Sequence, residues 1–205
     1  MAAGMAAWIG DPLATRGWAW LCNHGLVDNA EPIEREMTIC PECGAEVPAI
    51  DGATHAYVPA AAGCWATFTQ MQAEELRRWG RALAHGVVVD SYMAQHPGDG
   101  SDPRARRSPI VHLVGLCARL EHGLDDGQVG VLLQRTAETL RSGDAVPLAP
   151  RADSGHITVL DLANCDDAGI YAVRARCWAT EVWRTWAHEH SRIHELYRQA
   201  WPMGR

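Results

Sequence analysis

The sequence contains one pair of cysteines at the spacing of a metal knuckle, Cys40-Pro-Glu-Cys43-Gly44. Two thiolates separated by two residues can both face one ion, and the glycine that follows lets the chain reverse so that backbone amides donate to sulfur. A structural zinc ion is tetrahedral and needs two further ligands. We predict Cys64, at the start of an expected helix whose dipole stabilises a thiolate, and His55, in the loop before it.

Two other interpretations of these cysteines stay open. Cys22 and His24, upstream of the knuckle, could replace ligands in the predicted set. Alternatively, Cys40 and Cys43 are ordinary buried thiols and the motif is a coincidence. The remaining cysteines lie within or beside apolar helical faces, where a free thiol behaves as a small hydrophobic group. These predicted core thiols are Cys117, Cys165 and Cys177.

Histidines in the later part of the chain predict a second metal site. His96 ends one expected helix and His112 opens the next, so antiparallel packing would bring both rings to one end of a bundle. His190 and His194 are four residues apart on the last expected helix, the separation at which two imidazoles can share an ion. We therefore predict a site of His96, His112 and His190 with one open coordination position, as in catalytic metal centres.

Two further side chains are predicted to assist this histidine site. Asp90 and Tyr92 precede His96 on the same expected helix and are predicted to assist proton transfer or to orient a metal ligand. Asp90 could equally be exposed. A histidine near a helix end is often only a cap or a solvated side chain. The histidines to which this simpler interpretation applies first are His122, His188 and His194.

The composition excludes several other functions. The chain has 205 residues, and its 18 basic residues are all arginine, against 25 Asp and Glu, for a net charge of −7. Without lysine there is no Schiff-base amine, no pyridoxal phosphate anchor and no Walker phosphate loop. An acidic chain is not expected to bind nucleic acid, and no apolar run predicts a membrane helix. Seven cysteines without an export signal predict a cytoplasmic protein whose thiols are free or bind metal.

The elements that must position these residues are expected to be helices. Apolar periodicity and stop signals predict helices over 64–79, 81–96, from Ser108-Pro109 onward, 126–141 and 168–199, with a short helical turn over 158–162. The predicted fold class is mainly α, a bundle of four to five helices with an N-terminal zinc-knuckle loop region. The predicted parts are an N-terminal extension (1–36), a zinc-knuckle region packed on the body (37–66) and a helical bundle (67–201).

The predicted extension carries three tryptophans, Trp8, Trp18 and Trp20, among Gly, Pro and Asn residues. Exposed tryptophans in a free tail are costly, so this segment is expected to pack on the body or to grip a protein partner. A product that started at Met37 would begin just before the knuckle.

Six short blocks of this sequence, in the same order, resemble a bacterial family of unknown function, DUF5946. The blocks are Cys40–Ala45, Asp51–Tyr57, Gly63–Trp65, Val89–Gly98, Val111–Leu113 and Val182–Trp186 with His190. Members of the family begin near the equivalent of Met37, so residues 1–36 depart from its pattern. The resemblance implies membership and no activity. A looser similarity of architecture, to DinB-like helical bundles that bind metal through three histidines, likewise assigns no chemistry.

These residues predict one of two functions. The first is a small metal-dependent enzyme acting on a small molecule, with structural zinc at the knuckle and zinc or another divalent ion at the three histidines. The second is a non-catalytic, zinc-stabilised binding module that docks a protein partner through residues 1–36. The enzyme hypothesis predicts two metal ions per chain, and the binding-module hypothesis predicts one.

Overall fold

The computed structural model describes residues 36–80, 83–142 and 145–202. The chain divides between Arg35 and Glu36 into two units, and every described residue belongs to the second. The predictions made for the N-terminal extension, including the alternative ligands Cys22 and His24 and the partner-binding tryptophans, fall outside the described residues.

Two short strands precede a series of helices. The strands β1 (Met37–Ile39) and β2 (Glu46–Pro48) pair antiparallel, with Thr38 opposite Val47. The helices are α2 (Ala62–Trp79), α3 (His85–Gln95), α4 (Pro103–Leu120), α5 (Asp126–Ser142), α6 (Leu160–Ala163), α7 (Ala168–Thr185) and α8 (His190–Ala200), with a 3-10 turn, η1 (Ala187–Glu189), between the last two. The predicted mainly α fold is confirmed. Among the described helices, none combines the length and the hydrophobicity that a membrane crossing needs.

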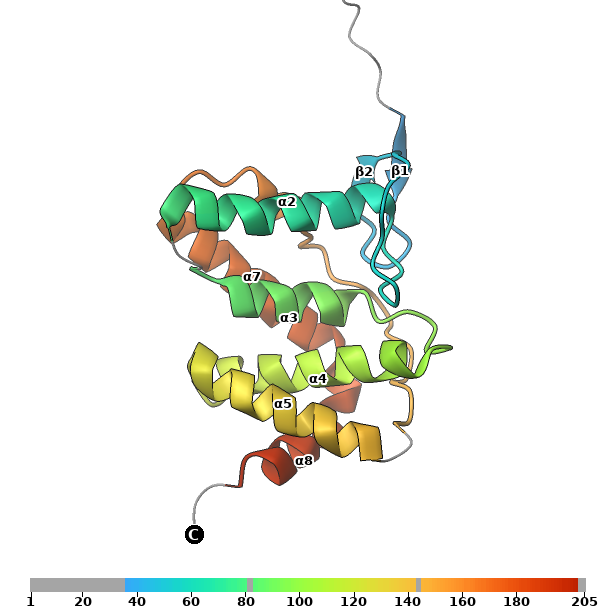
Figure 1. Ribbon diagram of the computed structural model, residues 1–205, viewed down its shortest axis with the longest axis vertical. Coiled ribbons are helices and arrows are strands. Elements are labelled where there is room, and N and C mark those ends of the chain that lie inside the picture. Colours follow the sequence, from blue (N-terminus) through green and yellow to red (C-terminus); the bar gives the residue numbers. More distant parts are fainter. Residues whose placement is uncertain (1–35, 81–82, 143–144, 203–205) are drawn as a thin grey trace, which may run out of the picture. The chain divides into compact units, whose positions relative to one another are not determined.

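The helices pack in an order that can be followed in Figure 1. The view shows α2, α3 and α4 one below another, with α8 at the lower end. Helix α3 packs against α4 and α7, and α4 also packs against α5 and α8. The helices bury apolar side chains in one shared core. The largest fully buried aliphatic and aromatic side chains include Trp178, Trp186, Tyr92, Tyr171, Ile110, Leu113 and Leu116.

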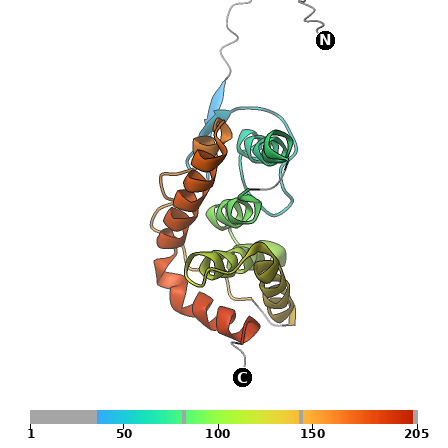
Figure 2. The same cartoon turned by 90° about the vertical axis from the view of Figure 1, so that its left-hand side faces the viewer.

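The single helix predicted over 168–199 is two helices in the structure. Trp186 leaves the helical conformation, with φ −101° and ψ 18°, and α8 continues in a new direction (Figure 2). No glycine or proline marks this break. Instead, Trp186 is 1% exposed and its indole Nε1 donates to the Ala94 carbonyl at 3.1 Å. The burial of one large side chain therefore overrides the helix propensity of the segment.

Helix α4 begins before its predicted start. The predicted cap is Ser108, with Pro109 in the first turn, but Pro109 lies inside the helix. The observed cap is Asp102, whose carboxylate accepts from the Arg104 amide at 2.6 Å, with Pro103 as the first helical residue. Both pairs match the pattern of a capping side chain followed by proline, so this pattern alone does not select the true start.

Helices α3 and α4 approach closely where Gly115 faces Asp90. A Cβ atom at Gly115 would lie 2.5 Å from Asp90 Oδ2. This carboxylate is buried, and it accepts from Arg119 Nε at 3.0 Å and contacts His112 Nδ1 at 2.8 Å. The absence of a side chain at Gly115 thus lets a charged group of α3 lie directly against α4.

We predict that Gly115→Ala lowers the free energy of unfolding by about 1–3 kcal/mol, because the added methyl group must displace the buried carboxylate. The matched control is Gly130→Ala in α5, where a Cβ meets no atom within 4 Å. That change is expected to raise the free energy of unfolding by up to about 1 kcal/mol, since alanine has the higher helix propensity. Urea denaturation measures both. Equal effects of the two substitutions would contradict the close approach.

Candidate metal centre

The turn between β1 and β2 brings the two knuckle sulfurs to one side of the hairpin. Gly44 has φ +75°, a conformation that favours glycine, and its amide donates to the Cys40 carbonyl at 2.9 Å. The Cys40 amide in turn donates to the Ala45 carbonyl at 2.8 Å. These bonds close the turn, and Cys40 and Cys43 are left only 1% and 3% exposed.

Two helix ends supply the other ligating groups of this region. Cys64 lies in the first turn of α2, which starts so close to β2 that a Cβ at Gly63 would lie 2.2 Å from the Pro48 carbonyl oxygen. His96 ends α3, because the following Pro97 disfavours the helical conformation in the residue before it. Cys64 and His96 are 0% and 2% exposed.

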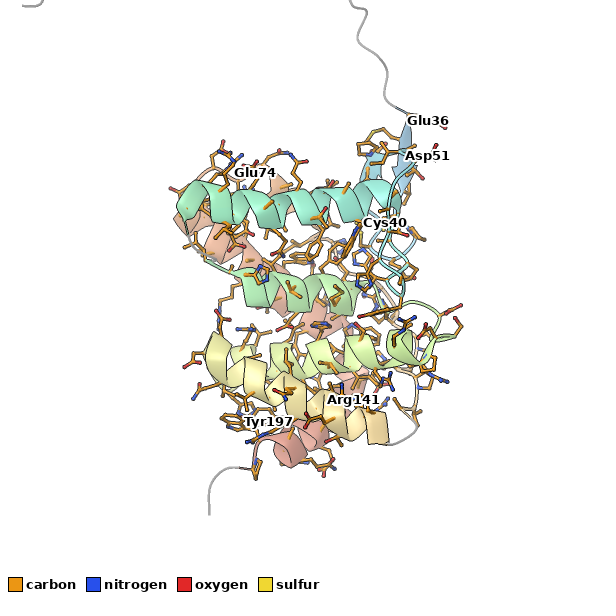
Figure 3. The ribbon with its side chains drawn as sticks, viewed as in Figure 1. Glu36, Cys40, Asp51, Glu74, Arg141 and Tyr197 are labelled. Atoms are coloured by element: carbon orange, nitrogen blue, oxygen red, sulfur yellow. The ribbon has the colours of Figure 1, made fainter. Side chains whose placement is uncertain are left out.

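Cys40, Cys43, Cys64 and His96 form one buried group, the cysteine–histidine centre. His96 Nε2 lies 3.6 Å from Cys40 Sγ and 3.5 Å from Cys64 Sγ, and Cys43 Sγ lies 3.8 Å from Cys64 Sγ. A tetrahedral zinc ion with typical bond lengths separates two sulfurs by about 3.8 Å and a sulfur from a nitrogen by about 3.6 Å. The group, beside the N-terminal end of α2 (Figure 3), can therefore hold a metal ion such as zinc.

Helix α3 fixes the orientation of the His96 ring. Its Nδ1 donates to the Tyr92 carbonyl at 2.7 Å, which leaves the Nε2 lone pair facing the sulfurs. The Tyr92 ring stacks on His96 with centroids 4.0 Å apart, and the Tyr92 hydroxyl donates to Cys64 Sγ at 3.5 Å. Tyr92, predicted to orient a metal ligand, thus contacts two members of the cysteine–histidine centre.

The electrostatics of the centre favour a positive charge between the sulfurs. Hydrogen bonds from Cys43 and Cys64 hold the pKa of Cys40 far below its ordinary value, and the bond to Cys40 raises the pKa of Cys43. Burial lowers the pKa of His96, but its contacts with Cys40 and Cys64 outweigh burial and raise that pKa to about 9. A bound metal cation would supply the positive charge and permit every thiol to ionise.

His55, predicted as a zinc ligand, is not part of the centre, and His96 takes the place assigned to it. The His55 ring packs edge-on against Tyr57 with centroids 4.3 Å apart, and lies 5.1 Å from the Trp65 ring. A backbone bridge between His55 and Val58 closes this loop locally and holds the ring among aromatic side chains. The sequence feature that could have identified His96 is its position directly before Pro97, the proline that ends the helix.

The predicted three-histidine site does not form. His96 lies in the cysteine–histidine centre, and His112 contacts Asp90. The His190 ring stacks on Trp183 with centroids 3.8 Å apart, and its Nε2 donates to the Trp183 carbonyl at 3.0 Å. The described residues contain two groups that could hold a metal, and neither is this trio. The physical reason is that each ring has a different local partner: the sulfurs for His96, Asp90 for His112 and Trp183 for His190.

Asp90, predicted as a proton-transfer residue, belongs instead to a buried ion-pair network between helices. Its side chain is 2% exposed and joins α3 to His112 and Arg119 of α4, and Arg119 also pairs with Asp126 of α5. Such a network positions helices.

The remaining thiols differ in exposure. Cys117 and Cys165 are buried, as predicted, whereas Cys177 is exposed, so its prediction as a core residue is wrong. Cys117 is also one of three side chains in the second group that could hold a metal, together with Glu121 and His194. The sequence predicts Cys117 as a core thiol and His194 either as a partner of His190 at one ion or as a solvated side chain.

The fold and the centre define a mainly helical protein in which three buried cysteines and one histidine are grouped as in a metal site. The chain belongs to a family of unknown function, DUF5946, whose profile matches residues 38–187. All four residues of the cysteine–histidine centre lie within this range. Comparisons with curated proteins and with solved structures gave no match. The similarity to DinB-like bundles is not confirmed.

We predict that Asp90→Ala lowers the free energy of unfolding by about 1–3 kcal/mol, because it removes the acceptor that Arg119 Nε and His112 Nδ1 share while Asp126 still pairs with Arg119. The metal content of the folded protein should not change, since Asp90 lies outside the cysteine–histidine centre. Asp51→Ala, in an exposed loop, is the charge-matched control and should leave stability unchanged. A loss of metal in the Asp90 variant at full stability would contradict this assignment.

Proposed function

We propose that this is a metal-binding protein whose cysteine–histidine centre holds one structural zinc ion. The observation that carries the proposal is the spacing of four buried donor atoms at the separations of a tetrahedral zinc site. Three thiolates and one imidazole are a common ligand set for structural zinc. Because these four protein ligands fill every position, the proposal assigns no catalytic role to this centre.

The proposed ion would join segments that are distant in the chain. Cys40 and Cys43 belong to a hairpin whose strands have three residues each, too short to be stable alone. Cys64 lies on α2 and His96 at the end of α3, 56 residues beyond Cys40 in the chain. Structural zinc contributes on the order of 10 kcal/mol to the folding of small domains. The ion would therefore act as the cross-link that fixes the hairpin to the helices.

The choice of ligands is tested by zinc content, measured by atomic emission on purified variants. His96→Ala should lose one zinc ion per chain, whereas His55→Ala should retain it, because His55 is not part of the centre. His96→Cys should also retain the ion, since four thiolates form a structural zinc site. This rescue separates ligand loss from misfolding. Retention of zinc by His96→Ala together with its loss in His55→Ala would overturn the proposed ligand set.

The structural role is tested by thermal unfolding. Cys43→Ser should lower the melting temperature by more than about 10 °C, and a chelator should produce a similar drop in the unmodified protein. Cys177→Ser is the matched control, because that cysteine is exposed on α7. Melting curves that are unchanged by both Cys43→Ser and the chelator would rule out a structural ion.

A further inference from the structure

A second group of metal-ligating side chains lies between α4 and α8. Cys117 lies on α4, Glu121 is the residue that caps the C-terminal end of α4 one turn later, and His194 is on α8. Glu121 Oε2 lies 3.9 Å from Cys117 Sγ and 2.7 Å from His194 Nε2. The three ligand atoms all lie within 4.8 Å of one another. This group is independent of the cysteine–histidine centre, because the two share no residue.

The two groups also lie far apart in the described part of the chain. Figure 3 labels Cys40 near the upper end of the helices and Tyr197, on α8 with His194, near the lower end. His194 follows the residues that the family profile matches, which end at 187. The family match therefore does not cover all three residues of this second group, and the evidence for the group is its geometry in this structure.

Trp183 orients the carboxylate of the second group. Its indole Nε1 donates to Glu121 Oε1 at 2.9 Å, which leaves Oε2 to face the thiol and the imidazole. Trp183 is itself held by His190, which stacks on it and donates to its carbonyl. A hydrogen bond that fixes the free oxygen of a ligating carboxylate is a common feature around metal ions.

A cavity of about 480 Å³ adjoins Glu121 and His194. This volume lies within the range of small-molecule sites in proteins. The other lining residues are His122, Tyr197, Arg198 and Trp201. His122 and Tyr197 stack face to face, with centroids 4.1 Å apart, and form an aromatic wall. The cavity can therefore accommodate an aromatic or apolar body beside the carboxylate and the imidazole.

We infer that Cys117, Glu121 and His194 hold a second divalent metal ion, best matched by zinc, whose fourth position takes water or a small molecule with a donor atom from the adjoining cavity. Thiolate, carboxylate and imidazole are all ligands of zinc, and three protein ligands with one open position are the layout of catalytic zinc sites. In a tetrahedral site, nitrogen and oxygen are about 3.3 Å apart, so His194 and Glu121 would move apart by about 0.6 Å.

The alternative is a plain ion pair between His194 and Glu121. Their side chains are each 36% exposed, and an ion pair at such a position is weak. In that alternative the Cys117 thiol only donates a hydrogen bond to Glu121 Oε2, at 3.9 Å. The two interpretations therefore differ in whether the thiol binds a metal.

Metal stoichiometry tests the inference, with zinc as the probe. Full-length protein is saturated with Zn²⁺, freed of loose metal by gel filtration and analysed by atomic emission. The unmodified chain should retain two ions, and His194→Ala and Cys117→Ser should each retain one. The controls His156→Ala, in an exposed loop, and Cys177→Ser should retain two. Two ions in His194→Ala, or a single ion in the unmodified chain that His194→Ala still retains, would overturn the second site.

The same assay separates failure of the second site from failure of the first. If the chain retains one ion that His96→Ala removes and His194→Ala does not, the cysteine–histidine centre stands and the second site is refuted. If the ion survives in His96→Ala but not in His194→Ala, the second site stands alone. Because His194 is partly exposed, its replacement by alanine is not expected to prevent folding.

The open position is tested with cobalt and imidazole. In protein whose cysteine–histidine centre is already filled with one Zn²⁺ ion, Co²⁺ added to the second site should show thiolate-to-cobalt absorption that Cys117→Ser removes. Added imidazole should shift this absorption by taking the fourth position. Absorption that Cys117→Ser leaves intact would refute ligation by Cys117. A cobalt spectrum that imidazole leaves unchanged would refute the open position.

Discussion

Three sulfur atoms and one imidazole nitrogen meet in a buried part of this protein, and how many of the thiols ionise depends on how their charges are balanced. Closely spaced thiols buried without a cation compete for ionisation, which is reflected in the opposite pKa shifts of Cys40 and Cys43. A metal ion removes this competition because it stabilises every thiolate at once. The hairpin, the start of α2 and the end of α3 would then be held by four bonds to one atom.

The part of this centre that the sequence predicts is the part encoded locally. Cys40 and Cys43 are separated by two residues, and Cys64 follows at an expected helix start, so spacing and helix chemistry suffice to select them. His96 is separated from Cys64 by 32 residues and reaches it only because α3 packs below α2. A choice based on proximity along the chain favours His55, whose loop instead directs the ring toward Tyr57 and Trp65.

The helices, too, are predicted correctly where the signal is local in the sequence and incorrectly where packing between distant segments decides. The periodic apolar residues of α2 and α5 predict these helices to within a few residues of their observed bounds. The break between α7 and α8 has no local signal, because it follows from the burial of Trp186 beside Ala94 of α3. Beyond the break, His190 stacks on Trp183 of α7, and His194 meets Glu121 near Cys117. The sequence predicts His194 as a partner of His190 at one ion or as a solvated side chain, and Cys117 as a core thiol.

The central claim is that three sulfurs and one nitrogen surround a single zinc ion. Zinc X-ray absorption spectroscopy on His194→Ala protein containing one zinc per chain tests it most directly, since that variant lacks a ligand of the second site. The account predicts three sulfur neighbours at about 2.3 Å and one nitrogen at about 2.0–2.1 Å. A first shell of nitrogen and oxygen atoms, with no sulfur, would contradict it.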